Sequence, residues 1–62
     1  MSDELSPEEQ PLLLLVDDDP TFTRVLARAL SRRGLRVDTA GGAEEAMQIA
    51  RERQPDFAVL DL

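Results

Sequence analysis

The chain has 62 residues. At this length folding buries only about 60% of the surface that the unfolded chain exposes, which excludes two independent domains. Because the sequence has no cysteine and no histidine, it excludes disulfides, thiolate chemistry, zinc sites and imidazole catalysis. The net charge is -6, from 13 acidic residues and 7 arginines, which argues against nucleic acid or an anionic membrane as a direct partner.

The segment 1–11 is acidic and has almost no apolar surface to bury. It supplies four of the six net negative charges and contains two prolines. We expect a disordered, solvated leader here. The start of the chain has no basic region followed by a cleavable apolar stretch, and the longest apolar run, residues 12–16, is far too short to cross a bilayer. We therefore expect a cytoplasmic chain with no membrane partner.

The first half of the chain predicts a buried strand and then a helix. Residues 12–16 read LLLLV, a continuous apolar run typical of a strand that is buried on both faces of a parallel sheet. Asp19 and Pro20 form a strong helix start, with Asp19 as the N-cap. Gly34 is suited to end this helix in a left-handed conformation. One face of the helix is apolar, formed by Phe22, Val25, Leu26, Ala29 and Leu30.

The second half of the chain predicts a strand, a helix and a further strand. Residues 35–39 alternate between apolar and polar side chains, which indicates a strand near the edge of a sheet. Residues 43–53 form a helix that ends before Pro55. Its inward face is expected to consist of Ala46, Met47, Ile49 and Ala50. Residues 56–61 form a third, mostly apolar strand, of the kind that is buried in the centre of a sheet.

Strands that alternate with single helices imply an α/β fold with a parallel sheet and right-handed crossovers. In the flavodoxin-like, doubly wound version of this fold the strand order is 2-1-3, so the first and third strands would lie roughly 4.8 Å apart. Their carboxyl ends would bring together Asp17, Asp18 and Asp61. Such a cluster either raises carboxylate pKa values or recruits a cation. Oxygen ligands favour Mg²⁺, which would make one carboxylate a competent phosphoryl acceptor.

Two stretches at these strand ends carry a resemblance to a known family. Residues 12–20, LLLLVDDDP, and residues 55–62, PDFAVLDL, resemble the two N-terminal motifs of a response-regulator receiver domain. The resemblance implies a CheY-like fold in which Asp61 is the phosphoacceptor. It also implies that Asp18 and Asp61 bind Mg²⁺ directly and that Asp17 reaches the metal through water.

A narrower resemblance is carried by DDPTFTR at residues 18–24, LARA at 26–29 and RG at 33–34. These stretches are similar to the RegA/PrrA/RoxR group of redox-responsive two-component regulators, in which a Fis-type helix-turn-helix domain follows the receiver. The resemblance implies that residues 12–62 are the N-terminal half of a receiver, and that any contact with DNA is made by a C-terminal domain absent from this chain. It further implies a sensor histidine kinase as partner, a homo-oligomer, and a signalling role without enzymatic activity.

Two alternatives to the receiver remain open at this stage. The pattern LVDDDPT at residues 15–21 also satisfies the motif of haloacid-dehalogenase-type phosphatases, with Asp17 as nucleophile and Asp19 as acid/base. That family normally places an irregular flap between the motif and its first helix, whereas a capped helix is predicted to begin at Pro20. The second alternative is an assembly fragment without signalling activity, which pairs the edge of its third strand with another copy.

Overall fold

The computed structural model describes residues 9–61, and most of the predicted leader, residues 1–8, lies outside the described residues. The elements follow the predicted order of three strands and two helices. They are β1 (Leu12–Asp17), α1 (Pro20–Ser31), β2 (Arg36–Ala40), α2 (Ala43–Arg53) and β3 (Phe57–Asp61). No helix within the described range is long and apolar enough to cross a membrane.

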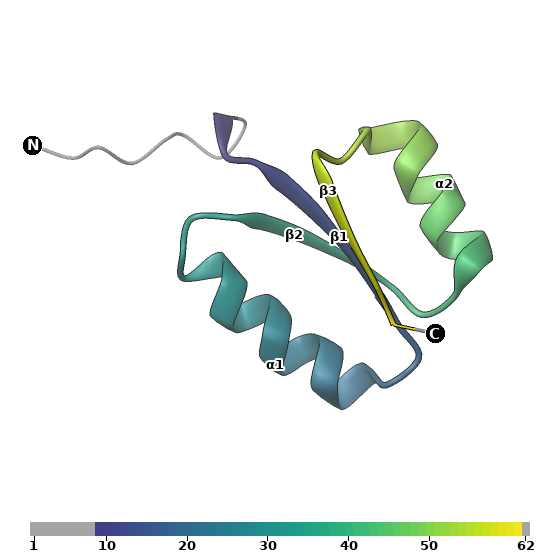
Figure 1. The fold of residues 1–62 in the computed structure, drawn as a ribbon, viewed down its shortest axis with the longest axis horizontal. Coiled ribbons are helices and arrows are strands. Elements are labelled where there is room, and N and C mark those ends of the chain that lie inside the picture. The colour runs from purple at the N-terminus through teal and green to yellow at the C-terminus, as the bar shows by residue number, and fades with distance from the viewer. Residues whose placement is uncertain (1–8, 62) are drawn as a thin grey trace, which may run out of the picture.

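The three strands form one parallel sheet in the order β2-β1-β3 (Figure 1). The predicted flavodoxin-like strand order is therefore confirmed for this part of the fold. In the register of the sheet, Leu13 of β1 pairs with Phe57 and Asp17 pairs with Asp61. Because the strands are parallel, their carboxyl ends all lie along the same edge of the sheet, which we call the carboxyl edge. Asp17 and Asp61 lie at this carboxyl edge.

Local signals set the ends of α1 as predicted. The Asp19 carboxylate accepts hydrogen bonds from the backbone N–H groups of Thr21 and Phe22, at 3.0 and 3.1 Å, and Pro20 occupies the first helical position. These bonds satisfy donors that have no partner within the helix. After the last turn Gly34 has a φ of 92°, a left-handed conformation in which glycine has no Cβ to clash.

The core lies around β1, which is buried along its whole length. The two helices cover opposite sides of the sheet (Figure 1), and both pack against β1 and β2. On the α2 side, Leu14 and Val16 pack with Ala40 and Ala46, and Ile49 lies against this cluster. Side chains alternate between the faces of a strand, so Leu13 and Leu15 lie on the α1 side.

Several apolar residues that the sequence predicts to be buried are exposed. All five residues of β3 are exposed, as are Phe22 and Val25 of α1 and Met47 and Ala50 of α2. The apolar pattern of β3 therefore does not lead to burial in this chain, and the inward assignment of Met47 and Ala50 is wrong. The reason is that both helices pack over β1 and β2, so β3 lies at the edge of the sheet without a helix over either face.

The Leu15 side chain should carry a large share of the stability, since it is only 1% exposed. We expect Leu15→Ala to lower the free energy of unfolding by about 2–5 kcal/mol, through lost burial and the cavity left behind. Val25→Ala is the matched control, because Val25 is 64% exposed, and it should change stability by no more than about 0.5 kcal/mol. Urea unfolding followed by circular dichroism measures both, and similar losses would contradict this description of the core.

Candidate acidic site at the carboxyl edge of the sheet

Two adjacent parallel strands end in an aspartate at the same edge of the sheet. Asp17 is the last residue of β1 and Asp61 is the last residue of β3, and the two are partners in the strand register. Partners in adjacent strands point to the same face of a sheet, here the face that α1 covers. Asp18 follows in the loop between β1 and α1. The structure thus brings together the residues of the predicted cluster.

The three carboxylates differ in how they are held. Asp17 is buried, with 6% of its surface exposed, and its Oδ1 accepts a hydrogen bond from the backbone N–H of Asp19 at 3.0 Å. Asp18 and Asp61 are exposed to solvent. Asp17 is therefore a fixed group, whereas the other two carboxylates can be reached by a molecule that approaches from solution.

The close approach of acidic groups changes the protonation of Asp61. Its pKa is raised above the usual value of 3.8, first by a side-chain hydrogen bond with Asp17 and then by the negative charge of Asp17. Partial loss of hydration and the charge of Asp18 act in the same direction. Each of these effects favours the neutral form of Asp61, since the ionised form adds a negative charge beside others.

The donor set fits a hard divalent cation, although the geometry is not that of a ready-made metal cage. Within residues 9–61 no three acidic side chains are grouped so as to hold a metal ion. Asp17, Asp18 and Asp61 nevertheless offer only oxygen donors, as Mg²⁺ prefers, and Mg²⁺ is usually held by one or two carboxylates together with water and phosphate oxygens. The raised pKa of Asp61 reflects a negative field that a cation would relieve.

An open cleft of about 570 Å³ lies beside the acidic residues. Its walls come from the end of β1 and the loop after it, the first turns of α1, and the end of β2 with the glycine that follows. They include Asp17, Asp18, Thr23, Arg24, Thr39 and Gly41. Arg24 is the one cation among the described lining residues. The cleft therefore gives Asp17 and Asp18 a solvent-accessible side next to a positive group, whereas Asp61 does not line it.

Sequence reasoning missed Thr23, which is buried in the first turns of α1. Its hydroxyl donates a hydrogen bond to the backbone carbonyl of Asp19 at 2.7 Å. The bond ties the helix to the loop that carries the acidic residues, so Thr23 supports the position of that loop. A threonine four residues after a predicted N-cap is the signal that could have revealed it, because threonine hydroxyls bond to carbonyls at this helical spacing.

The Asp19 carboxylate caps α1, as predicted, and the helix begins at the next residue. The phosphatase alternative requires this carboxylate as an acid/base and normally a flap before the first helix. Among the described residues there is no flap between the acidic loop and Pro20. The local structure therefore does not favour the phosphatase alternative.

Asp61→Asn should stabilise the chain at neutral pH in the presence of a chelator. A carboxyl group whose pKa is raised by folding stabilises the fold below its unfolded pKa, and this contribution is lost as the pH rises through the folded value. We expect the variant to melt at a higher temperature than the unchanged chain at neutral pH, and this difference to vanish below pH 3.8. Thermal melts over this pH range measure the effect, and a difference that grows toward acid pH would contradict it.

Comparison with known proteins identifies the family of the chain. The family model described as the response regulator receiver domain matches residues 13–62. The photosynthetic apparatus regulatory protein RegA of Cereibacter sphaeroides is 48% identical over 50 residues, which cover 81% of this chain and 27% of RegA. The acid tolerance regulatory protein ActR of Rhizobium meliloti is 43% identical over 61 residues, 98% of this chain and 30% of ActR.

A third relative is named as a transcriptional regulator. The transcriptional regulatory protein AfsQ1 of Streptomyces coelicolor is 42% identical over 52 residues, which cover 84% of this chain and 23% of AfsQ1. The chain thus spans between 23% and 30% of the length of these three curated relatives. No solved structure gives a significant match. The family model and the identities together show that the chain belongs to the response regulator receiver domain family.

Proposed function

We propose that residues 12–62 form the N-terminal half of a receiver in which Asp61 accepts a phosphoryl group from a sensor histidine kinase. The observation that carries this proposal is the pairing of Asp61 with Asp17 at the carboxyl edge of a parallel sheet. Membership of the receiver family supports the assignment. In open α/β sheets this edge is where ligands bind.

The exposed carboxylate of Asp61 suits it for nucleophilic attack. One of its oxygens attacks the phosphorus of the kinase phosphohistidine, and the bond between phosphorus and the imidazole nitrogen breaks. The electron pair stays on that nitrogen, and the product on Asp61 is an acyl phosphate. The ionised carboxylate is the form that attacks, and the acidic neighbours that raise the pKa of Asp61 disfavour it, so a bound cation would favour the attacking form.

Asp17, Asp18 and Asp61 are the residues that would hold Mg²⁺. The ion would offset the negative charges of the phosphoryl group and of the carboxylates as they approach. Asp17 is suited to a fixed place in this set because the N–H of Asp19 orients its carboxylate. Asp18 is exposed and can adjust its position when a ligand enters. Asp61 is then both a metal ligand and the acceptor.

The output of this site is proposed to be control of transcription in the cytoplasm. AfsQ1 is by its name a transcriptional regulator, and RegA and ActR are named as regulatory proteins. The acyl phosphate would bias a two-state surface of the receiver that controls oligomerisation and a DNA-binding domain. Because the chain spans only a part of each relative, we assign DNA binding to a part of the complete protein outside residues 1–62.

Phosphorylation of the complete protein tests the proposal directly. Incubation with acetyl phosphate and Mg²⁺ should add the mass of one phosphoryl group, as read by intact mass spectrometry, and Asp61→Asn should abolish the addition. Asp19→Asn is the matched control, because asparagine caps a helix as well as aspartate does and Asp19 has no part in the transfer. Incorporation that survives in Asp61→Asn would overturn the assignment.

The same variants separate the receiver from a phosphatase. With p-nitrophenyl phosphate as substrate we expect no sustained turnover by the unchanged protein. Steady turnover that is lost in Asp19→Asn would instead identify Asp19 as an acid/base group and support the phosphatase mechanism. A receiver thus predicts that Asp19→Asn leaves phosphorylation unchanged, whereas a phosphatase predicts that Asp19→Asn abolishes turnover.

The exposure of β3 favours a second candidate, a strand-pairing assembly role of the isolated chain. All five β3 residues are exposed, and within residues 9–61 only β1 pairs with this strand. An open strand edge is a template for pairing with another chain. We expect sedimentation velocity to detect association of the isolated chain at high concentration, and Val59→Lys to suppress it by placing a charge on that strand. A chain that stays monomeric at every concentration would exclude this role.

A further inference from the structure

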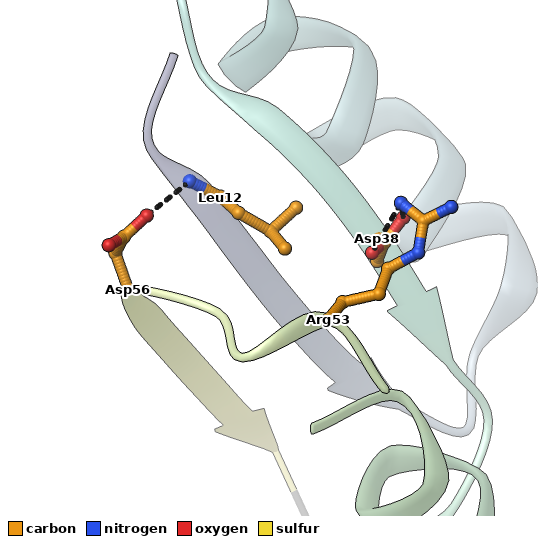
Figure 2. A network of polar contacts seen from close by, with 4 residues as sticks. All are labelled: Leu12, Asp38, Arg53 and Asp56. Atoms are coloured by element: carbon orange, nitrogen blue, oxygen red, sulfur yellow. Dashed lines mark hydrogen bonds and ion pairs between the residues drawn. The ribbon is translucent and has the colours of Figure 1, made fainter. Parts of the chain in front are cut away.

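The amino ends of β1 and β3 are joined by a reciprocal contact between Asp56 and Leu12. Asp56 precedes β3, and its Oδ2 accepts a hydrogen bond from the backbone N–H of Leu12 at 2.8 Å (Figure 2). The backbone N–H of Asp56 in turn donates to the carbonyl of Leu12 at 2.8 Å. Both polar groups of one buried β1 residue are thus satisfied by a single residue at the start of β3.

We propose that Asp56 is a positioning residue, whose carboxylate fixes the register of β3 on β1 and so holds Asp61 opposite Asp17. The functional part of this inference rests on the proposed receiver function. Asp56 and Asp61 lie at opposite ends of β3, so Asp56 acts on the site through the strand and has no contact with the phosphoryl group.

The site is sensitive to register because Asp61 must meet Asp17. A slip of one residue would turn Asp61 to the opposite face of the sheet. A slip of two residues would keep the face but move Asp61 along the strand by roughly 6.6 Å, two steps of about 3.3 Å each. Either change would separate the acidic residues that the proposed function requires.

Within residues 9–61, few other features of β3 specify the register. Backbone ladder bonds form equally well in any register, because every residue other than proline offers the same N–H and C=O groups. Packing adds little, since all five β3 residues are exposed and both helices pack over the other two strands. At the carboxyl end, Asp17 and Asp61 repel each other when both are ionised. The bond from Leu12 to Asp56 is specific to one register and lies at the end away from this repulsion.

Three variants of the complete protein test the role of Asp56. Asp56→Ala removes the acceptor, and Asp56→Asn keeps an amide oxygen at the same place. Asp38→Ala is the matched control, because it removes an ion pair of 3.3 Å with Arg53 (Figure 2) without touching the pairing of β1 with β3. Cross-strand NMR contacts between the backbones of Asp17 and Asp61 report the register. Isothermal titration calorimetry with Mg²⁺ measures the affinity of the acidic site for the ion.

We expect Asp56→Ala to lose the cross-strand contacts and to bind Mg²⁺ more weakly, because a shift of β3 would carry Asp61 away from Asp17. Asp56→Asn should restore both properties. Asp38→Ala should lower the melting temperature and leave both unchanged. A purely structural role of Asp56 would predict that Asp56→Ala behaves like Asp38→Ala.

Wild-type cross-strand contacts in folded Asp56→Ala would overturn the proposal, whatever the melting temperature. If that variant does not fold, Asp56→Leu, which keeps a similar side-chain volume but offers no acceptor, takes its place, and unchanged contacts in this variant would overturn the proposal equally. If the unchanged protein itself binds no Mg²⁺, the proposed function fails. The NMR contacts still decide the register in that case, so the two failures are distinguishable.

Discussion

The parallel pairing of β1 with a strand on each side organises this chain. β1 is buried along its length, pairs with β2 on one edge and β3 on the other, and receives one helix on each face (Figure 1). Its apolar side chains supply most of the core. The carboxyl ends of parallel strands all lie at the same end of the sheet. This pairing therefore also brings Asp17 and Asp18, at the end of β1, close to Asp61, the last residue of β3.

The proximity of Asp17, Asp18 and Asp61 lowers the stability of the fold, because like charges lie side by side. Burial of apolar side chains around β1 stabilises the sheet, whereas Asp17 is buried at its end and raises the pKa of Asp61 beside it. A structure selected for stability alone would place a neutral or basic group at one of these positions. The chain instead retains like charges at adjacent strand ends, and such local conflicts are characteristic of functional sites.

Local sequence patterns predicted the elements and the Asp19 cap, because each depends on residues close together in the chain, whereas the strand order followed from the known order of the flavodoxin-like fold. Burial was predicted less well. Met47 and β3 have apolar patterns, but whether an apolar residue is buried depends on what lies over it, and here both helices cover β1 and β2. The role of Asp56 could not be predicted from local rules, because its partner Leu12 lies 44 residues away.

That long separation has a kinetic consequence. The unit formed by β1, α1 and β2 closes short loops, whereas β3 must close a loop about twice as long before it gains any contact, at a greater cost in chain entropy. We therefore expect β3 to dock last, and substitutions in it to change the rate of unfolding more than the rate of folding. The repulsion between Asp17 and Asp61 then arises only after the rate-limiting barrier, so the acidic site does not slow the folding of the chain that carries it.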